Sequence, residues 1–172
     1  VSAALRSLPA VVGIVWDASG SGSKRDLARE FALLDTYFKR MGNGEVRLTR
    51  IRDAAEAVGR FHISNGDWST LRRALEATPY DGATQLGVFT AEADVREYLL
   101  FSDGLDNFGE RPFSKIKVPL YAVNSASQAD PARLRRLANG HGGKYLDLTS
   151  NTAAEAAHSL LYTEASIVNL QG

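Results

Sequence analysis

The stretch VVGIVWDASGSGS, residues 11–23, decides the fold that we expect for this chain. Its apolar run, residues 11–16, ends abruptly at Asp17, and a short loop of small hydroxyl residues and glycines follows. A continuous apolar run bounded by turn residues is typical of a strand buried on both faces of a parallel sheet. Because ligands of open α/β sheets bind beyond the carboxyl ends of the strands, Asp17, Ser19 and Ser21 are candidate ligand-binding residues. Their oxygen atoms suit a hard cation such as Mg²⁺.

Predicted strands and helices alternate along the rest of the chain. Residues 24–41 carry apolar side chains at helical spacing, and the segments 45–51 and 57–63 are predicted to form an antiparallel pair of strands near one edge. Further apolar runs and capping residues predict strands over 97–102, 118–123 and 144–148, and helices after Asp67, from Asp130 and over 152–162. We therefore expect an α/β fold: a doubly wound, mostly parallel central sheet with one antiparallel edge strand, helices on both faces and strand 11–16 in the middle.

The composition excludes several classes of function. Of the 172 residues, 44% are hydrophobic and 23% are charged, as in an ordinary globular protein. Lysine plus arginine equals aspartate plus glutamate at 20 each, so the net charge gives no reason to expect binding to nucleic acid or to an anionic membrane. The absence of cysteine excludes disulfides, zinc–thiolate sites and cysteine nucleophiles. No apolar run approaches the roughly 20 residues that span a bilayer.

We expect residues 1–172 to form one domain, with a core over about residues 10–162. The chain has no initiator methionine, its first ten residues lack the layout of a signal peptide, and residues 166–170 resemble the start of another strand. These features predict a domain that belongs to a longer protein. Any signal or anchor would then lie outside this sequence, which leaves the compartment open.

Two further polar loops complete a recognisable pattern. Thr84 lies in the loop Asp-Gly-Ala-Thr, and Asp103 lies in Ser-Asp-Gly directly after the predicted strand 97–102. Together with Asp17, Ser19 and Ser21, in this order and spacing, the set resembles a von Willebrand factor A-type (VWA) domain with its metal ion-dependent adhesion site. The resemblance covers almost the whole chain, from about residue 10 to residue 162.

The resemblance implies a metal ion, Mg²⁺ or Mn²⁺ with Ca²⁺ as a further candidate, at the carboxyl ends of the strands. Ser19 and Ser21 would bind it directly, and Thr84 directly or through water. Asp17 and Asp103 would act mainly through coordinated waters and hydrogen bonds. An open coordination position would then accept a Glu or Asp carboxylate of a partner protein. The implied function is a non-catalytic adhesion or protein-binding module, a monomer that binds neither nucleic acid nor, through this domain, a membrane.

Each part of the pattern also has a purely structural interpretation. Asp17 and Ser19 alone could cap the first helix, Thr84 alone could be a turn hydroxyl, and Asp103 followed by glycine is a common turn. Gly22 departs from the family, which often has a methionine or another large apolar residue there. We expect this glycine to make the loop more mobile.

Other functional classes explain the sequence less well. A phosphatase with an aspartate nucleophile needs a second acid two residues after Asp17, where this chain has Ser19. Residues 20–24 lack the spacing of a phosphate-binding loop, and no histidine is placed as the base of a serine hydrolase. An intracellular scaffold that assists an ATPase uses the same kind of domain, so this function remains an alternative to adhesion.

The stretch VGIVWDASGSGSKRDLAREFALLDTYF, residues 12–38, also resembles bacterial proteins that join a VWA domain to a vault protein/inter-alpha-trypsin type domain. This second resemblance depends on the overall pattern of the stretch and not on a diagnostic motif. It implies that the full protein carries such a companion domain upstream and is exported or anchored in a membrane.

Overall fold

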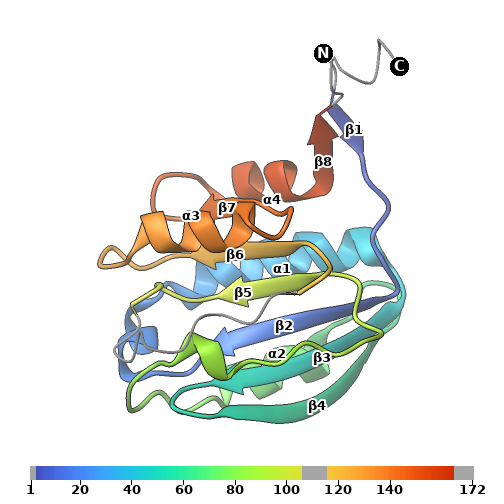
Figure 1. Ribbon diagram of the computed structural model, residues 1–172. Helices are drawn as coiled ribbons and strands as arrows, with labels where there is room; N and C mark the ends of the chain where they lie inside the picture. The colour runs from blue at the N-terminus through green and yellow to red at the C-terminus, as the bar shows by residue number, and fades with distance from the viewer. Residues whose placement is uncertain (1–2, 106–115, 165–172) are drawn as a thin grey trace.

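A six-stranded sheet forms the centre of the molecule in the computed structural model, which describes residues 3–105 and 116–164 (Figure 1). The strand order is β4-β3-β2-β5-β6-β7. The strands are β2 (Val11–Asp17), β3 (Gly44–Ile51), β4 (Ala55–Ile63), β5 (Tyr98–Phe101), β6 (Leu120–Asn124) and β7 (Tyr145–Asp147).

The direction of these strands confirms the predicted topology. β2 pairs in parallel with both β3 and β5, and β5–β6 and β6–β7 are also parallel. Only the edge strand β4 runs antiparallel, against β3. The carboxyl ends of the parallel strands therefore meet at one edge of the sheet, the sheet top. Asp17, the last residue of β2, lies at this edge in the middle of the sheet.

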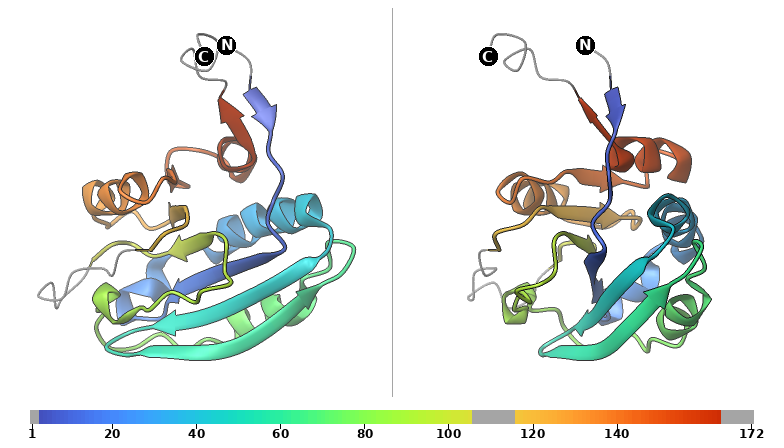
Figure 2. Two further views of the ribbon diagram at one scale, coloured as in Figure 1. Left: turned by 45° about the vertical axis from the view of Figure 1, so that its right-hand side comes forward. Right: turned by 90° about the vertical axis from the view of Figure 1, so that its right-hand side faces the viewer.

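Helices cover both faces of the sheet, as expected (Figures 1 and 2). One face packs against three helices and the other mainly against α3, so apolar residues on alternate positions of each strand enter two separate core clusters. The helices of the first face are α1 (Leu27–Met41), α2 (Ser69–Glu76) and α4 (Ala153–Leu161). The second face has α3 (Pro131–Asn139) and the short 3₁₀ helix η2 (Leu86–Val88).

Trp16 is the largest fully buried side chain and lies directly beneath the sheet top. Its ring stacks on Phe31 of α1, with centroids 6.2 Å apart, and tilts against Phe101 of β5 at 5.0 Å. Its Nε1 donates a hydrogen bond to the Tyr80 hydroxyl at 2.9 Å. An indole buries a large apolar area and satisfies its single donor here, which fixes β2 against α1.

The first helix begins later than the sequence predicts. Residues 20–24 form the 3₁₀ helix η1 (Gly20–Lys24), and α1 starts at Leu27 instead of Lys24. Asp26 caps α1 because its carboxylate accepts the Arg29 N–H at 3.2 Å. The interpretation of Asp17 and Ser19 as caps of this helix is therefore wrong.

A two-stranded ribbon, β1 (Ala3–Leu5) with β8 (Tyr162–Glu164), projects from the body beyond α4 and the β7 edge of the sheet (Figures 1 and 2). The sequence analysis did not predict it, and the strand expected from residue 166 lies outside the described residues. At its base the Arg6 guanidinium makes a two-pronged ion pair with the buried Glu97, at 2.9 and 3.2 Å. This pair attaches the ribbon to the start of β5.

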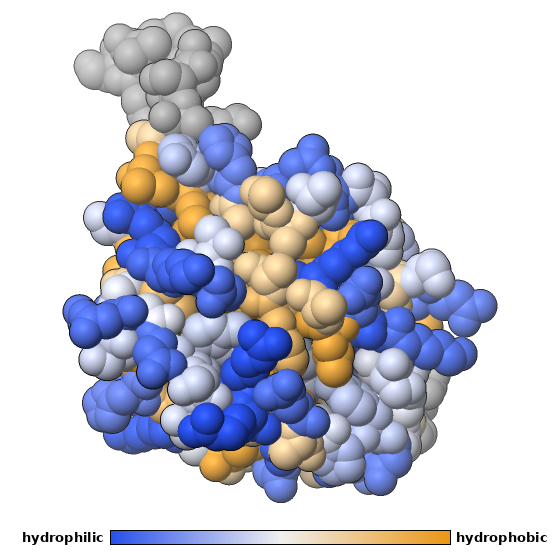
Figure 3. Space-filling model, turned by 180° about the vertical axis from the view of Figure 1, so that it is seen from behind, coloured by the Kyte–Doolittle hydropathy of each residue, from blue (hydrophilic) through white to orange (hydrophobic). Residues whose placement is uncertain are grey.

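The outer surface of α1, α2 and α4 is largely hydrophilic, with an apolar strip that runs from the base of the ribbon toward the middle of the face (Figure 3). Among the described residues, only Leu5 and Leu105 are large apolar side chains with an exposed surface. Within the same ranges, no helix has the length and apolar character needed to cross a membrane.

Candidate metal site

Asp17 is the centre of the hydrogen-bond network at the sheet top. Its carboxylate is fully buried, and both of its oxygens accept hydrogen bonds. Oδ1 accepts the Ser19 N–H at 2.9 Å and the Thr84 hydroxyl at 3.0 Å, whereas Oδ2 accepts the Ser102 hydroxyl at 2.6 Å. A carboxylate held from three directions is fixed in orientation, which suits a residue that positions other ligands.

Ser19 and Ser21 face one another across the loop after β2. Their Oγ atoms are 3.2 Å apart, Ser19 is buried and Ser21 is half-buried. A backbone hydrogen bond from Gly20 N–H to the carbonyl of Gly82, at 2.9 Å, ties this loop to the loop that carries Thr84. The two seryl hydroxyls therefore point to a common region, as the D-x-S-x-S spacing predicts.

Thr84 is brought to Asp17 by the geometry of its own loop. Gly82 has φ +71°, a backbone conformation that glycine adopts without a steric penalty. The Asp81 N–H bonds the carbonyl of Ala18 at 3.2 Å, and the Gln85 N–H bonds the carbonyl of Arg52 at 2.7 Å. These bonds hold the loop between β2 and the end of β3, and Thr84 is almost fully buried. The Thr84 hydroxyl therefore lies beside Asp17 and bonds its carboxylate, as expected if both belong to one site.

Asp103 joins the site through its neighbour Ser102 and makes no hydrogen bond to the other four candidates in the described part of the chain. Its Oδ1 accepts the Leu105 N–H at 3.0 Å, which is the turn role foreseen for this residue. Its Oδ2 is buried and has no hydrogen-bond partner among the described residues. A buried carboxylate oxygen without a partner costs free energy, so it indicates a missing donor or cation.

These donors fit a hard divalent cation. Hydrogen bonds link Asp17, Ser19, Ser21 and Thr84, and Asp103 follows Ser102, which bonds Asp17. All five side chains offer oxygen atoms of the kind that Mg²⁺ and Mn²⁺ prefer. No group of three or more His, Cys, Asp or Glu side chains that could hold a metal ion occurs in residues 3–105 and 116–164, the sheet top included, so a cation here would depend on the hydroxyl oxygens as well. The unpartnered Asp103 Oδ2 is the feature that a cation, or water bound to it, would satisfy.

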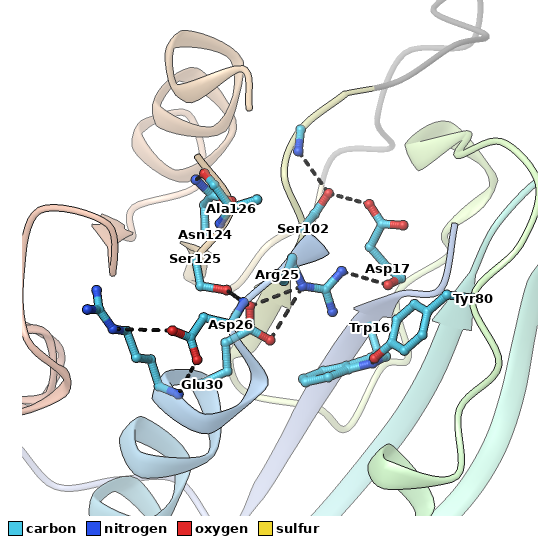
Figure 4. Close-up of polar contacts among 12 residues, drawn as sticks. Trp16, Asp17, Arg25, Asp26, Glu30, Tyr80, Ser102, Asn124, Ser125 and Ala126 are labelled. Carbon is cyan, nitrogen blue, oxygen red and sulfur yellow. Dashed lines mark hydrogen bonds and ion pairs between the residues drawn. The ribbon is translucent and has the colours of Figure 1, made fainter. Parts of the chain in front are cut away.

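Sequence reasoning missed Ser102 and a buried ion pair beneath the loop. Ser102 donates to Asp17 and accepts the Gly104 N–H at 3.0 Å. The signal for it was its position directly before Asp103 at the end of a buried strand. Arg25 and Glu30 form a fully buried pair at 3.0 Å, and the Arg25 guanidinium also donates to the carbonyl oxygen of Asp17 at 2.7 Å (Figure 4).

Burial and the contact between the two side chains act in opposite directions on the pKa of each member of this pair. Burial lowers the pKa of Arg25, but the carboxylates of Glu30 and Asp17 outweigh it and raise the pKa above its ordinary value. Arg25 is therefore a permanent cation near the site. Burial raises the pKa of Glu30 above its ordinary value, against the opposing effect of Arg25 and of the Ser125 hydroxyl, which donates to Glu30 at 2.7 Å.

A scan of known protein families and a search of curated proteins found no match to this sequence. Solved structures do match. An aerotolerance-related membrane protein from Bacteroides fragilis, with multiple mutations to serines, has a TM-score of 0.62 and 14% identity, over 88% of this chain and 96% of that chain. The protein BatB from Bacteroides thetaiotaomicron has a TM-score of 0.57 and 15% identity, over 88% and 96%.

A third solved structure is of a protein named for the von Willebrand factor A domain. A von Willebrand factor type A protein from Catenulispora acidiphila has a TM-score of 0.57 and 15% identity, over 87% of this chain and 40% of that chain. At such identities the likeness concerns the fold alone. The chain therefore has the VWA fold, with a mostly parallel sheet and with Asp17 at the carboxyl end of a central strand.

Proposed function

We propose that this domain binds a divalent cation at the sheet top and through it docks an acidic side chain of a partner protein. The observation that carries the proposal is the unpartnered, buried Oδ2 of Asp103 beside the hydrogen-bonded set of Asp17, Ser19, Ser21 and Thr84. A merely structural set of turn residues would satisfy this oxygen with a donor of its own, as the same loop does for Oδ1.

The hydrogen bonds indicate which of the five residues would contact the cation directly and which would orient the others. Both oxygens of Asp17 are engaged by protein donors, so Asp17 orients the loop hydroxyls instead of neutralising the cation directly. Ser19 and Ser21 would hold the ion with their hydroxyl oxygens, Thr84 directly or through water, and Asp103 through its free oxygen or a bound water. When bound, the cation supplies a positive centre that attracts a carboxylate of the partner.

Two features of the described residues near the site could contact a protein partner. Leu105, two residues after Asp103, is one of the two exposed large apolar side chains among the described residues. Beside the Thr84 loop lies an open cleft of about 620 Å³, lined by Arg50, Arg52, Asp53, Ala54, Glu56, Asp81, Gly82 and Ala83. An extended segment on either side of the docking acid can contact this cleft or Leu105. The loop that continues from Leu105 lies outside the described residues.

Related alternatives share this fold. A scaffold that assists an ATPase would use the same cation and the same face, and a metal-dependent hydrolase would add turnover. The groups that hydrogen-bond the Asp17 carboxylate are two hydroxyls and a backbone amide, so none of them is a general base at neutral pH. We therefore favour binding over catalysis.

In the full protein we propose an upstream companion domain of the vault protein/inter-alpha-trypsin type, and export or membrane anchoring.

Calorimetric titration with Mg²⁺ and Mn²⁺ tests the metal site. Wild-type protein should bind either ion and gain thermal stability by mass action. Asp17→Ala should abolish both effects and leave the circular dichroism spectrum unchanged. Asp67→Ala, at an exposed aspartate next to α2, is the matched control and should bind as the wild type does. No binding at millimolar concentrations in the wild type would overturn the proposal.

Partner capture separates adhesion from catalysis. Protein captured from a native extract should be lost with EDTA, return with Mg²⁺ and be lost in Thr84→Ala. Capture that is unaffected by EDTA contradicts docking through a cation. Metal-dependent turnover of a generic phosphatase or esterase substrate that Asp17→Asn abolishes would favour the hydrolase instead.

A further inference from the structure

The Arg25 guanidinium connects the metal loop to the helix beneath it. One arm, Nη1, donates to the main-chain oxygen of Asp17 at 2.7 Å, and Nε donates to Glu30 of α1 at 3.0 Å (Figure 4). Its plane lies 4.9 Å from the Trp16 ring centroid and 5.9 Å from that of Tyr80. The remaining nitrogen, Nη2, is buried and has no hydrogen-bond partner in the described ranges. The side chain is thus held by two polar contacts and two rings.

Because Gly22 has no side chain, the Arg25 guanidinium and the Tyr80 ring can pack directly against the loop. A Cβ at this position would lie 2.8 Å from the Asp17 carbonyl oxygen, 3.0 Å from Arg25 Nη1 and 3.0 Å from Tyr80 Cδ1. Gly22 is buried, and its carbonyl accepts the Arg25 N–H at 3.2 Å. The loop residue that was expected to confer mobility therefore lies in a close-packed position, where the guanidinium and the tyrosine ring occupy the volume that a side chain would need.

The pair reaches a third element through Ser125. The Ser125 hydroxyl donates to Glu30 at 2.7 Å and accepts the backbone N–H of Asp26 at 2.6 Å. The chain of contacts therefore runs from the end of β2, through Arg25 and Glu30 of α1, to the loop after β6. All three segments border the sheet top, so the network fixes their relative positions without touching the site hydroxyls.

Stability alone does not account for such a pair. Burying two charges costs a large desolvation penalty, and replacing both members with apolar residues of similar size is often neutral or stabilising. Removing only one member is strongly destabilising, because the other charge stays buried without a partner. A buried pair of this kind is therefore a candidate for a positioning role.

We propose that Arg25, held in place by Glu30, is a positioning residue that keeps residues 18–22 in the geometry needed to bind the cation. The inference rests on the proposed function of the site, and it goes further by assigning metal affinity to residues that do not contact the metal. Gly22 is its steric partner, because any larger residue displaces either the guanidinium or the Asp17 carbonyl.

The chain provides a matched control at the opposite end of the sheet. Arg6, which is partly exposed, and the buried Glu97 form a second ion pair at 2.9 Å, and the Arg6 Cζ lies 4.9 Å from the ring centroid of Tyr121. The test compares the double variant Arg25→Met/Glu30→Met with Arg6→Met/Glu97→Met. Because each variant removes both charges, both are expected to fold.

Two measurements decide the outcome. In EDTA, amide hydrogen exchange at Ser19, Gly20 and Gly22 should be about tenfold faster in Arg25→Met/Glu30→Met than in the wild type and unchanged in the control. Mg²⁺ and Mn²⁺ should bind about tenfold more weakly to the first double variant and as in the wild type to the control. Unchanged exchange together with unchanged affinity overturns the inference, and so does tighter binding, which would show that Arg25 acts only by repelling the cation.

The exchange measurement separates this inference from the proposed function. If the wild type binds no metal, the proposed function fails, but slower exchange in the wild type than in Arg25→Met/Glu30→Met still supports the positioning role. Should that double variant fail to fold, Arg25→Lys serves instead. An ammonium keeps the charge but lacks the planar guanidinium that donates to the Asp17 carbonyl and to Glu30 at the same time. If the loop amides of Arg25→Lys exchange as slowly as those of the wild type, the guanidinium geometry is not needed and the positioning role is overturned.

Discussion

Thr84 donates a hydrogen bond to the carboxylate of Asp17 over 3.0 Å, although 67 residues separate the two in the sequence. The contact joins the loop after β2 to the loop that precedes η2, and both residues are buried. It brings two of the three short polar motifs together, and the hydrogen bond from Ser102 to Asp17 places the third beside them. The contact also means that a change at Thr84 acts both on the donor set for the cation and on the orientation of Asp17.

Thr84→Val should therefore affect stability and metal binding together. Valine keeps the shape but removes the hydroxyl, so Asp17 Oδ1 loses one of its two donors, and we expect a loss of about 1–2 kcal/mol in the free energy of unfolding. The rise in Tm on adding Mg²⁺ should also shrink. Thr36→Val, at an exposed helix position, is the control for the substitution itself. Unfolding by urea with and without Mg²⁺ measures both effects, and equal Mg²⁺ responses in the two variants would contradict the prediction.

Gly22→Ala should be far more damaging than Gly20→Ala in the same loop. The added methyl at Gly22 meets three atoms at 2.8–3.0 Å, whereas at Gly20 the nearest atom is a carbonyl oxygen at 3.5 Å, an ordinary contact. Overpacking of this kind costs about 1–3 kcal/mol. Thermal unfolding in EDTA compares the two variants without any contribution from metal. Similar Tm values would show that the loop adapts to the extra atom.

Asp147→Asn should lower stability at neutral pH and lose its effect in acid. Burial tends to raise the pKa of Asp147, but hydrogen bonds from Thr149 and Ser150 outweigh it and hold the pKa below its ordinary value. A carboxylate with a depressed folded-state pKa stabilises the fold above its unfolded pKa, near 3.9, and loses this contribution as the pH falls through the folded value. Solvent screening limits the effect to about 0.5–1 kcal/mol.

Urea unfolding of the wild type and of Asp147→Asn at about pH 6 and pH 3 measures this difference. The gap between the two proteins should be present at the higher pH and shrink at the lower. A gap that widens in acid would mean that the pKa of Asp147 is shifted in the other direction.

Glu97→Gln should destabilise the protein strongly without changing the metal site. Glu97 accepts hydrogen bonds from Arg6 and, at 2.6 Å, from the buried Tyr37 hydroxyl. The substitution leaves the largely buried Arg6 without a counter-charge, which costs about 3 kcal/mol. Chemical denaturation gives the loss, and amide exchange should be accelerated at the β1–β8 ribbon. Mg²⁺ affinity should match that of the wild type, because the pair lies at the opposite end of β5 from Ser102.

The sequence predicted the central sheet well because its signals are local. The run from Val11 to Trp16 is apolar throughout and is fully enclosed from Val12 onward, so its burial on both faces follows from composition alone. The antiparallel pair followed from the polarity pattern between residues 45 and 63, whereas the choice of β4 over β3 as the edge strand did not. The D-x-S-x-S spacing likewise brings Ser19 and Ser21 together without any long-range contact.

The remaining features depend on contacts that no local pattern encodes. Arg25 and Glu30 are both charged and lie at the start of a helical pattern, so their mutual burial could not be read from polarity. The ribbon strands have three residues each, too few to show a period, and the Thr163 hydroxyl meets the Ala4 carbonyl across 159 positions. The role of Gly22 appears only when Tyr80 is folded over it.

The β1–β8 ribbon has a practical consequence for how the domain can be presented. Residues 3 and 164 are paired partners, so both described ends of the chain leave the body together, beyond the β7 edge and apart from the carboxyl end of β2 (Figures 1 and 2). A resin, a fluorophore or a fusion partner can therefore be joined to either end of the ribbon at the same place on the body. In both cases the point of attachment lies away from the Asp17 loop.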